Sequence, residues 1–97
     1  MDGLSLQTSL RVSGDCMIRE VDGAAVILNL GSSTYFGLDP VGTRIWQLIE
    51  EHGRLGVVVT AMLGEYDAPA DAIERDVVRL VSELLERGLV VRSGDQA

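Results

Sequence analysis

The sequence is poor in the residue types that support catalysis or metal binding. Its 97 residues include one cysteine and one histidine. The single cysteine, Cys16, excludes an intramolecular disulfide and a CxxC pair, and agrees with a reducing, cytoplasmic location. His52 stands beside Gly53 at an expected helix end, where it faces water or the helix dipole. Since no nucleophile stands near a base and the carboxylates are scattered, we expect no enzyme, no metal site and no cofactor.

Basic residues and long apolar runs are also scarce. Eight basic residues stand against fifteen acidic residues, which gives a net charge of −7. This charge disfavours contact with nucleic acid, and either a basic partner or simple solubility accounts for it. The longest apolar run, residues 24–28, is too short to span a membrane. Because the first 14 residues also lack the pattern of a signal peptide, we expect no membrane partner.

The composition is that of one ordinary globular domain, with 46% hydrophobic residues. Asp22-Gly23 is a strong hairpin signal between two strand-like segments, and Gly31-Ser32 supplies a second turn. The pattern predicts a three-stranded antiparallel meander. Its strands are expected over residues 17–21, 24–30 and 33–38, with a further short strand over residues 10–12 of an N-terminal segment (residues 1–14).

Alternation along these strands predicts which side chains face the core. The polar Asn29 indicates that its face of the second strand is the wetter one. Ile27 shares that face, and Tyr35 is expected beside it. The inward set is therefore predicted to be Val26, Leu28, Leu30, Phe36 and Leu38.

Three helices are expected after the strands. The first begins at Asp39-Pro40, a capping residue followed by a residue suited to the first turn, and ends at Gly53. The second covers residues 55–65 and the third residues 69–87. On the third helix the apolar arc spans roughly 160°, more than packing on a core requires. Its excess flank, Val78, Val81 and Leu85, either packs under the N-terminal segment or the tail at residues 89–91, or meets a partner.

This order of elements resembles the PqqD-like family. The resemblance lies in residues 22–30, 33–53, 65–69 and 75–90, and its most specific part runs from Tyr35-Phe36-Gly37 to Ile45-Trp46. It implies an α+β, winged-helix-like domain over residues 15–91, with a three-stranded antiparallel sheet followed by three helices and a flexible tail at residues 92–97. Such a domain is a RiPP recognition element. It binds the leader of a ribosomally made precursor peptide and has no catalytic activity of its own.

The resemblance also implies a site and partners. The leader adds as a strand to the third strand and lies against the third helix, and the modifying enzyme is a leader peptidase, a macrocyclase or a radical SAM protein. Glu74 is expected to meet a basic leader residue, whereas Tyr35 and Ile27 are expected to contact the enzyme. The turn at residues 31–33 and the ending at residues 88–90 favour a stand-alone binder of the lasso-peptide type over the quinone pathway. The implied peptide-binding residues are Ser33, Thr34, Tyr35, Phe36, Glu74, Val77, Val78, Val81, Ser82 and Leu85.

Two other functions fit the same pattern. The unprotected third strand could pair with its own copy and form a weak homodimer. A winged helix could also bind DNA, although the basic residues of the third helix alternate with acidic ones, which disfavours phosphate contacts. These residues are Arg75, Arg79 and Arg87 against Asp76, Glu83 and Glu86.

Overall fold

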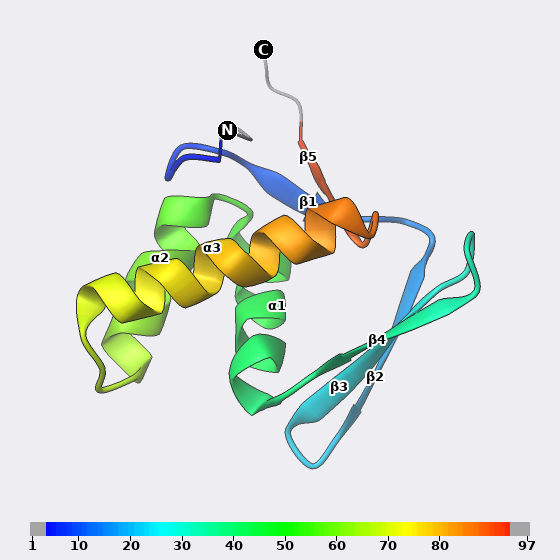
Figure 1. Cartoon of the computed structure of the whole chain (residues 1–97), viewed down its shortest axis with the longest axis horizontal. Coiled ribbons are helices and arrows are strands. Elements are labelled where there is room, and N and C mark those ends of the chain that lie inside the picture. Colours follow the sequence, from blue (N-terminus) through cyan, green and yellow to red (C-terminus); the bar gives the residue numbers. More distant parts are fainter. Residues whose placement is uncertain (1–3, 94–97) are drawn as a thin grey trace.

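Three strands lie side by side at one end of the molecule (Figure 1). The computed structural model describes residues 4–93. Its main sheet is antiparallel in the order β2 (Cys16–Val21), β3 (Ala24–Asn29) and β4 (Thr34–Leu38). Asp22 and Gly23 form the tight turn between β2 and β3, at φ values of 55° and 82°. Asp and Gly tolerate this left-handed region, so the hairpin prediction is confirmed.

The second turn is built around Asn29. Its side-chain oxygen accepts a hydrogen bond from the Gly31 amide at 2.9 Å, and its side-chain amide donates to the Arg87 carbonyl at 3.3 Å. Ser33, at φ 57°, is the last residue of this turn. The turn therefore includes Leu30 and Ser33, which the sequence pattern had placed in strands.

The two sides of β3 are the reverse of the prediction. Ile27 is 0% exposed and belongs to the core, whereas Val26 is 46% exposed. Ile27 pairs with Phe36 across the sheet, and Leu28 pairs with Tyr35 on the opposite face. Directly paired residues share a face, so Val26 and Leu28 point away from the helices.

Asn29 explains this error. It lies on the inward side of β3, yet its polar groups are used by the turn and by the Arg87 carbonyl. An inward polar residue is tolerated when its hydrogen bonds are satisfied, so Asn29 does not mark a wet face. Leu30, also predicted inward, is exposed in the turn. On β4 the prediction was correct, with Phe36 and Leu38 inward and Tyr35 outward.

The three helices begin and end close to where the sequence predicts. They are α1 (Pro40–His52), α2 (Leu55–Glu65) and α3 (Ala70–Glu86). The Asp39 carboxylate accepts a hydrogen bond from the Gly42 amide at 2.7 Å and caps α1. Gly53 ends α1 at φ 79°, with its amide donating to the Ile49 carbonyl. Both ends of α1 therefore follow directly from the residue types found there.

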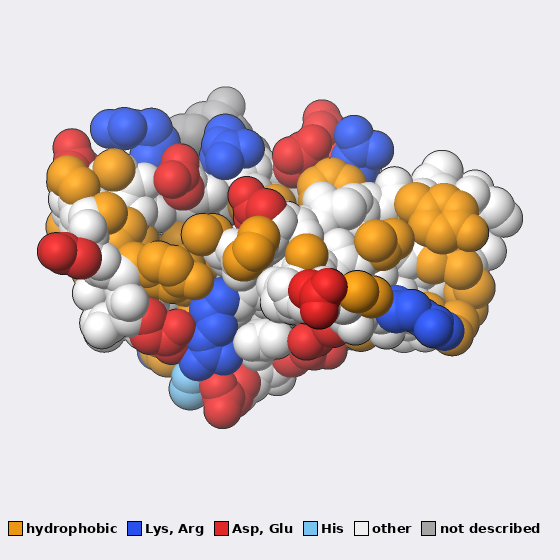
Figure 2. All heavy atoms as spheres, turned by 90° about the horizontal axis from the view of Figure 1, so that it is seen from below, with side chains coloured by type: hydrophobic (Ala, Val, Ile, Leu, Met, Phe, Trp, Pro, Cys, Tyr) orange, Lys and Arg blue, Asp and Glu red, His pale blue; other side chains and the backbone are white. Residues whose placement is uncertain are grey.

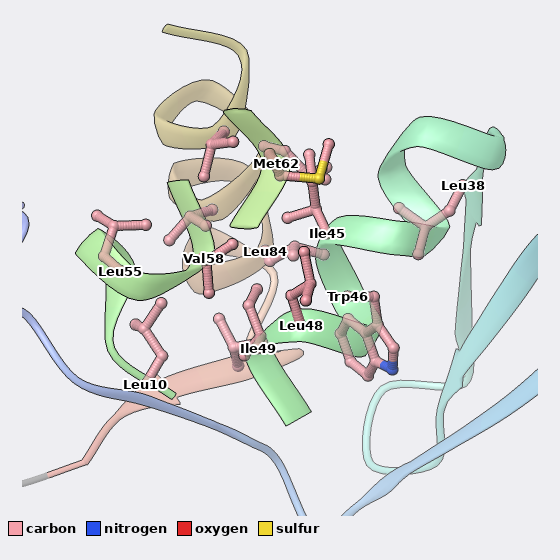
Figure 3. Close-up of a cluster of buried hydrophobic side chains, with 14 of the residues drawn as sticks. Leu10, Leu38, Ile45, Trp46, Leu48, Ile49, Leu55, Val58, Met62 and Leu84 are labelled. Carbon is pink, nitrogen blue, oxygen red and sulfur yellow. The ribbon is translucent and has the colours of Figure 1, made fainter. Parts of the chain in front are cut away.

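The core surrounds α1, which contacts α2, β3, β4 and a further short strand, β1 (Leu10–Val12) (Figure 3). Trp46 lies on the side of the cluster near the sheet, and Ile49 lies between Leu10 of β1 and the helices. The Trp46 indole N–H is buried and has no acceptor among the described residues. The large, fully buried residues come from the sheet, all three helices and a last short strand, β5 (Val90–Arg92), which makes one continuous core. They are Ile27, Ile45, Trp46, Leu48, Ile49, Leu55, Val58, Met62, Val77, Val81, Leu84 and Val90.

A second, two-stranded sheet joins two segments near the ends of the described part of the chain. It pairs β1 (Leu10–Val12), which the sequence predicts, with β5 (Val90–Arg92), which it does not. Ser93 donates to the Ser9 carbonyl and extends this pairing. The N-terminal segment is thus part of the fold. Of the predicted flexible tail, Arg92 is in β5, and residues 94–97 lie outside the described residues.

The N-terminal segment also caps α2 with its backbone. Arg54 at the start of α2 makes no side-chain capping bond. The free amides of Leu55 and Gly56 donate instead to the carbonyls of Thr8 and Leu6, at 2.9 and 2.8 Å. A Cβ on Gly56 would lie 2.9 Å from the Leu6 oxygen, so this crossing requires glycine. No helix within residues 4–93 has the length and apolar character needed to cross a membrane.

We predict opposite effects of alanine at the two glycines of α2. Gly56→Ala should lower the free energy of unfolding by about 1 kcal/mol or more, because the new Cβ displaces the backbone of residue 6. Gly64→Ala should raise it by about 0.5–1 kcal/mol, because a Cβ there meets nothing within 4 Å and alanine favours the helix. Urea unfolding of both variants measures the difference. Equal effects at the two positions would contradict the backbone cap.

The faces of β3 can be tested in the same way. Ile27→Ala should cost about 2–5 kcal/mol in unfolding free energy, because it leaves a cavity in the core. Val26→Ala should cost less than about 1 kcal/mol, because its side chain is partly in water already. Thermal and urea unfolding would check both values, and a larger cost at Val26 would show that our inward face is wrong.

Candidate functional site

The edge formed by β4 is open. In the sheet order β2-β3-β4, β4 has a strand partner on one side only among the described residues. Because backbone groups of a strand alternate between its two edges, about half of its N–H and C=O groups point away from β3. β4 also carries no charge and no proline, which are the usual protections of an edge. This edge can accept another extended chain.

A groove runs beside this edge, between β4, the first turns of α1 and the outer side of α3. It has a volume of about 440 Å³. We call it the β4–α3 groove. Its apolar part comes from β4, α1 and one leucine of α3, and its polar rim comes mostly from α3. The lining residues are Phe36, Gly37, Leu38, Asp39, Val41, Gly42, Ile45, Asp76, Arg79, Leu80 and Glu83.

The helical side of the groove carries charges of both signs. Arg79 lies 3.9 Å from Asp76, and Arg87 lies 3.7 Å from Glu83. The Arg87 guanidinium also lies over the Phe36 ring, 5.2 Å from its centroid. Arg87 thus borders the end of the groove at which β4 begins.

The structure divides the predicted strand residues between different surfaces. Phe36 lines the β4–α3 groove, whereas Tyr35 points to the opposite side of the sheet. Thr34 begins β4, and its hydroxyl lies 2.7 Å from that of Ser32. Ser33 belongs to the turn and not to the strand.

On α3 the structure places the predicted groove residues elsewhere. Val77 and Val81 are fully buried in the core. Val78 and Leu85 are partly buried against the core, on the side of α3 away from β4. Ser82 also lies outside the groove. With Leu85 and Arg92 it lines a separate depression.

The rotation of α3 about its own axis explains why these residues lie outside the groove. Residues 76, 80, 83 and 87 recur every three or four positions and so form one side of a helix. At about 100° per residue, Glu74 lies roughly 160° around the helix from Asp76, and Leu85 lies roughly 180° from Asp76. Both therefore face away from the groove. The apolar excess on α3 therefore faces β5, which contacts α3. The alternative in which this flank packs against the fold is favoured. A polar stripe next to an apolar arc was the missed signal for the groove.

The outer face of the sheet is a second candidate surface. Met17, Val21 and Tyr35 are 57%, 61% and 71% exposed on it. With Val26, Leu28 and Arg19 they line a hollow of about 340 Å³. Hydrophobic side chains gather at this end of the molecule in Figure 2, on the right, with blue arginine among them. Ile27, which was expected on this face, is in the core.

The single cysteine is not activated. Burial raises the pKa of the Cys16 thiol above its ordinary value, and the nearby Asp15 acts in the same direction. The thiol lies 3.7 Å from the Leu89 carbonyl, to which it donates. A protonated thiol is a weak nucleophile. Within residues 4–93 no group of three or more His, Cys, Asp or Glu residues is arranged to hold a metal ion.

The fold and the site define a class of small α+β domain that presents an unpaired strand beside a helix. A family model described as coenzyme PQQ synthesis protein D (PqqD) matches residues 24–90. The chain belongs to this family, which confirms the resemblance seen in the sequence. A search of curated proteins found no match.

Two solved structures share the fold. One, described as TbiB1 in complex with the TbiA(beta) leader peptide, has a TM-score of 0.80 and 35% sequence identity, and the match covers 88% of this chain and 99% of that one. The other, lasso peptide synthetase B1 complexed with the leader peptide, has a TM-score of 0.76 and 24% identity, over 86% and 98% of the two chains. The predicted fold class, a three-stranded antiparallel sheet with three helices, is confirmed.

Proposed function

We propose that this chain binds the leader segment of a ribosomally made precursor peptide and presents it to a modifying enzyme. The observation that carries the proposal is the open edge of β4 beside the β4–α3 groove. The leader adds to β4 as a fourth strand, so backbone hydrogen bonds supply affinity and the groove reads alternate side chains. The chain itself catalyses no reaction. Its family membership and the leader-peptide complexes of the two similar structures support this function.

The pathway that we propose is lasso-peptide biosynthesis. This choice is supported by the likeness to lasso peptide synthetase B1 complexed with the leader peptide. The turn at residues 31–33 and the ending at residues 88–90, which depart from the quinone-pathway pattern, also support it. The modifying enzyme, a leader peptidase or macrocyclase, contacts the outer face of the sheet. Tyr35 lies there on the reverse side of the strand that receives the leader, so one strand serves both contacts.

Loss of an apolar groove side chain should weaken leader binding. Val41 lines the groove and is 39% exposed in the first turn of α1. Val41→Asp should not harm folding, because an acid near a helix N-terminus is favourable. It should weaken the affinity for the leader about tenfold or more, since burying such a side chain is worth about 1.5–3 kcal/mol. Fluorescence anisotropy with labelled leaders from precursor-like reading frames beside its gene would measure this.

The matched control is Val57→Asp. Val57 is 40% exposed in the first turn of α2, outside the groove, so the chemical change is the same and the helix position differs by one residue. We expect it to retain the wild-type affinity. Equal loss in both variants would reject the groove as the binding site. Absence of saturable binding by the wild-type chain, with a concentration-dependent dimer in sedimentation, would instead favour pairing of β4 with a second copy.

Strand addition itself can be tested on the peptide. N-methylation of single leader residues removes one backbone donor and adds bulk, without changing the protein. Because alternate residues of an added strand point their amides towards β4, affinity should fall at every second position and change little between them. The anisotropy titration above would give these affinities. A uniform response along the leader would contradict an added strand.

A further inference from the structure

The groove side of α3 has a definite chemical order. Asp76, Leu80, Glu83 and Arg87 form one stripe along the helix, with Arg79 beside it. Leu80 is almost fully buried and contributes to the apolar part of the β4–α3 groove. The charges stand on both sides of this leucine, so an added strand would cover a charge, an apolar contact and further charges in sequence.

The outermost charges at the two ends of the groove differ in sign. Arg87 lies over Phe36 and receives a hydrogen bond at its carbonyl from Asn29, so it marks the end at which β4 begins. Asp76 precedes Arg87 by eleven residues, or roughly 16 Å along the helix, and so lies towards the other end of β4. Asp39 borders the groove at that end. The outermost charges are therefore the carboxylates of Asp76 and Asp39 at one end and the guanidinium of Arg87 at the other, with Arg79 and Glu83 between them.

These charges are free to change partners. The Arg79–Asp76 and Arg87–Glu83 distances, 3.9 and 3.7 Å, are long, and the four side chains are between 39% and 69% exposed. Exposed pairs of this kind contribute little to stability. A peptide that covers the groove removes water from them, and a charge left without a partner is then unfavourable. The peptide can therefore be selected by its own charges.

We propose that this charge order sets the register and direction of the bound leader. The inference rests on the proposed function. An apolar leader side chain lies over Leu80. A basic side chain two residues away points to the carboxylate end, because alternate strand residues are about 6.7 Å apart and Asp76 is about 6 Å from Leu80 along the helix. An acidic or neutral side chain lies towards Arg87. The role that the sequence assigned to Glu74 falls to Asp76.

A charge scan of the leader tests this inference. Each residue of a leader that binds in the titration above is replaced in turn by Lys and by Glu, and the affinities are measured by anisotropy. With the wild-type chain, one position should favour Lys over Glu by about tenfold, one tenfold step being about 1.4 kcal/mol. Asp76→Lys should reverse the preference at that position alone. Arg87→Glu should reverse a preference on the other side of the apolar anchor.

Asp71→Lys is the matched control. It makes the same charge change on the same helix, but Asp71 lies outside the groove and pairs with Arg75. It should keep the wild-type scan. If Asp76→Lys and Asp71→Lys give the same scan while binding persists, the inference is overturned and the proposed function stands. If the wild-type chain binds no leader, both fall together. Thermal unfolding of each variant confirms that it is folded.

Discussion

The hydrogen bond from the Gly42 amide to the Asp39 carboxylate fixes the point at which β4 becomes α1. Pro40 follows the cap with a backbone already suited to the first helical turn. A Cβ on Gly42 would lie 3.2 Å from both Asp39 and Leu38, so the junction is closely packed. Because α1 is surrounded by the core, this connection and the pairing of β4 with β3 together hold the open strand rigidly beside the helices. The groove depends on that rigidity, since two of its three walls meet at the junction.

Local chemistry explains which parts of the fold were predictable. The Asp-Gly turn, the Asp-Pro helix start and Gly53 each require a particular backbone conformation, and the residues at these points are the ones that adopt it. The helices and the meander were accordingly correct. The two faces of β3 were predicted the wrong way round, because the prediction depended on the polarity of one residue, Asn29. The side chain of Asn29 is satisfied by one local partner, the Gly31 amide, and one distant partner, the Arg87 carbonyl, and no sequence pattern shows these bonds. The pairing of β1 with β5 was missed for a similar reason, as it joins residues about eighty positions apart.

The candidate site was predictable as a place but not in its details. The aromatic, uncharged strand indicated an open edge, and the edge is open. The sequence assigned the helical contribution to a side of α3 other than the one that lines the groove. An apolar arc wider than a core contact has two flanks, and periodicity alone cannot show which one faces the sheet. The flank with Val78 and Leu85 packs against the fold, while the more polar flank borders the groove. The apolar pattern could not reveal this flank, because the groove side of α3 carries charges of both signs.

The small sheet of β1 and β5 brings residues near both ends of the described chain into direct contact. Ser93 donates a hydrogen bond to Ser9, and β5 lies on the opposite side of α3 from β4 in Figure 1. The strands β1 and β5 are therefore neighbours, and both lie away from the open edge. Such a domain can be joined to another protein through either end, or inserted within one, while β4 stays accessible. The segments through which the domain can be attached, next to β1 and β5, and the open edge of β4 thus lie on separate sides of α3.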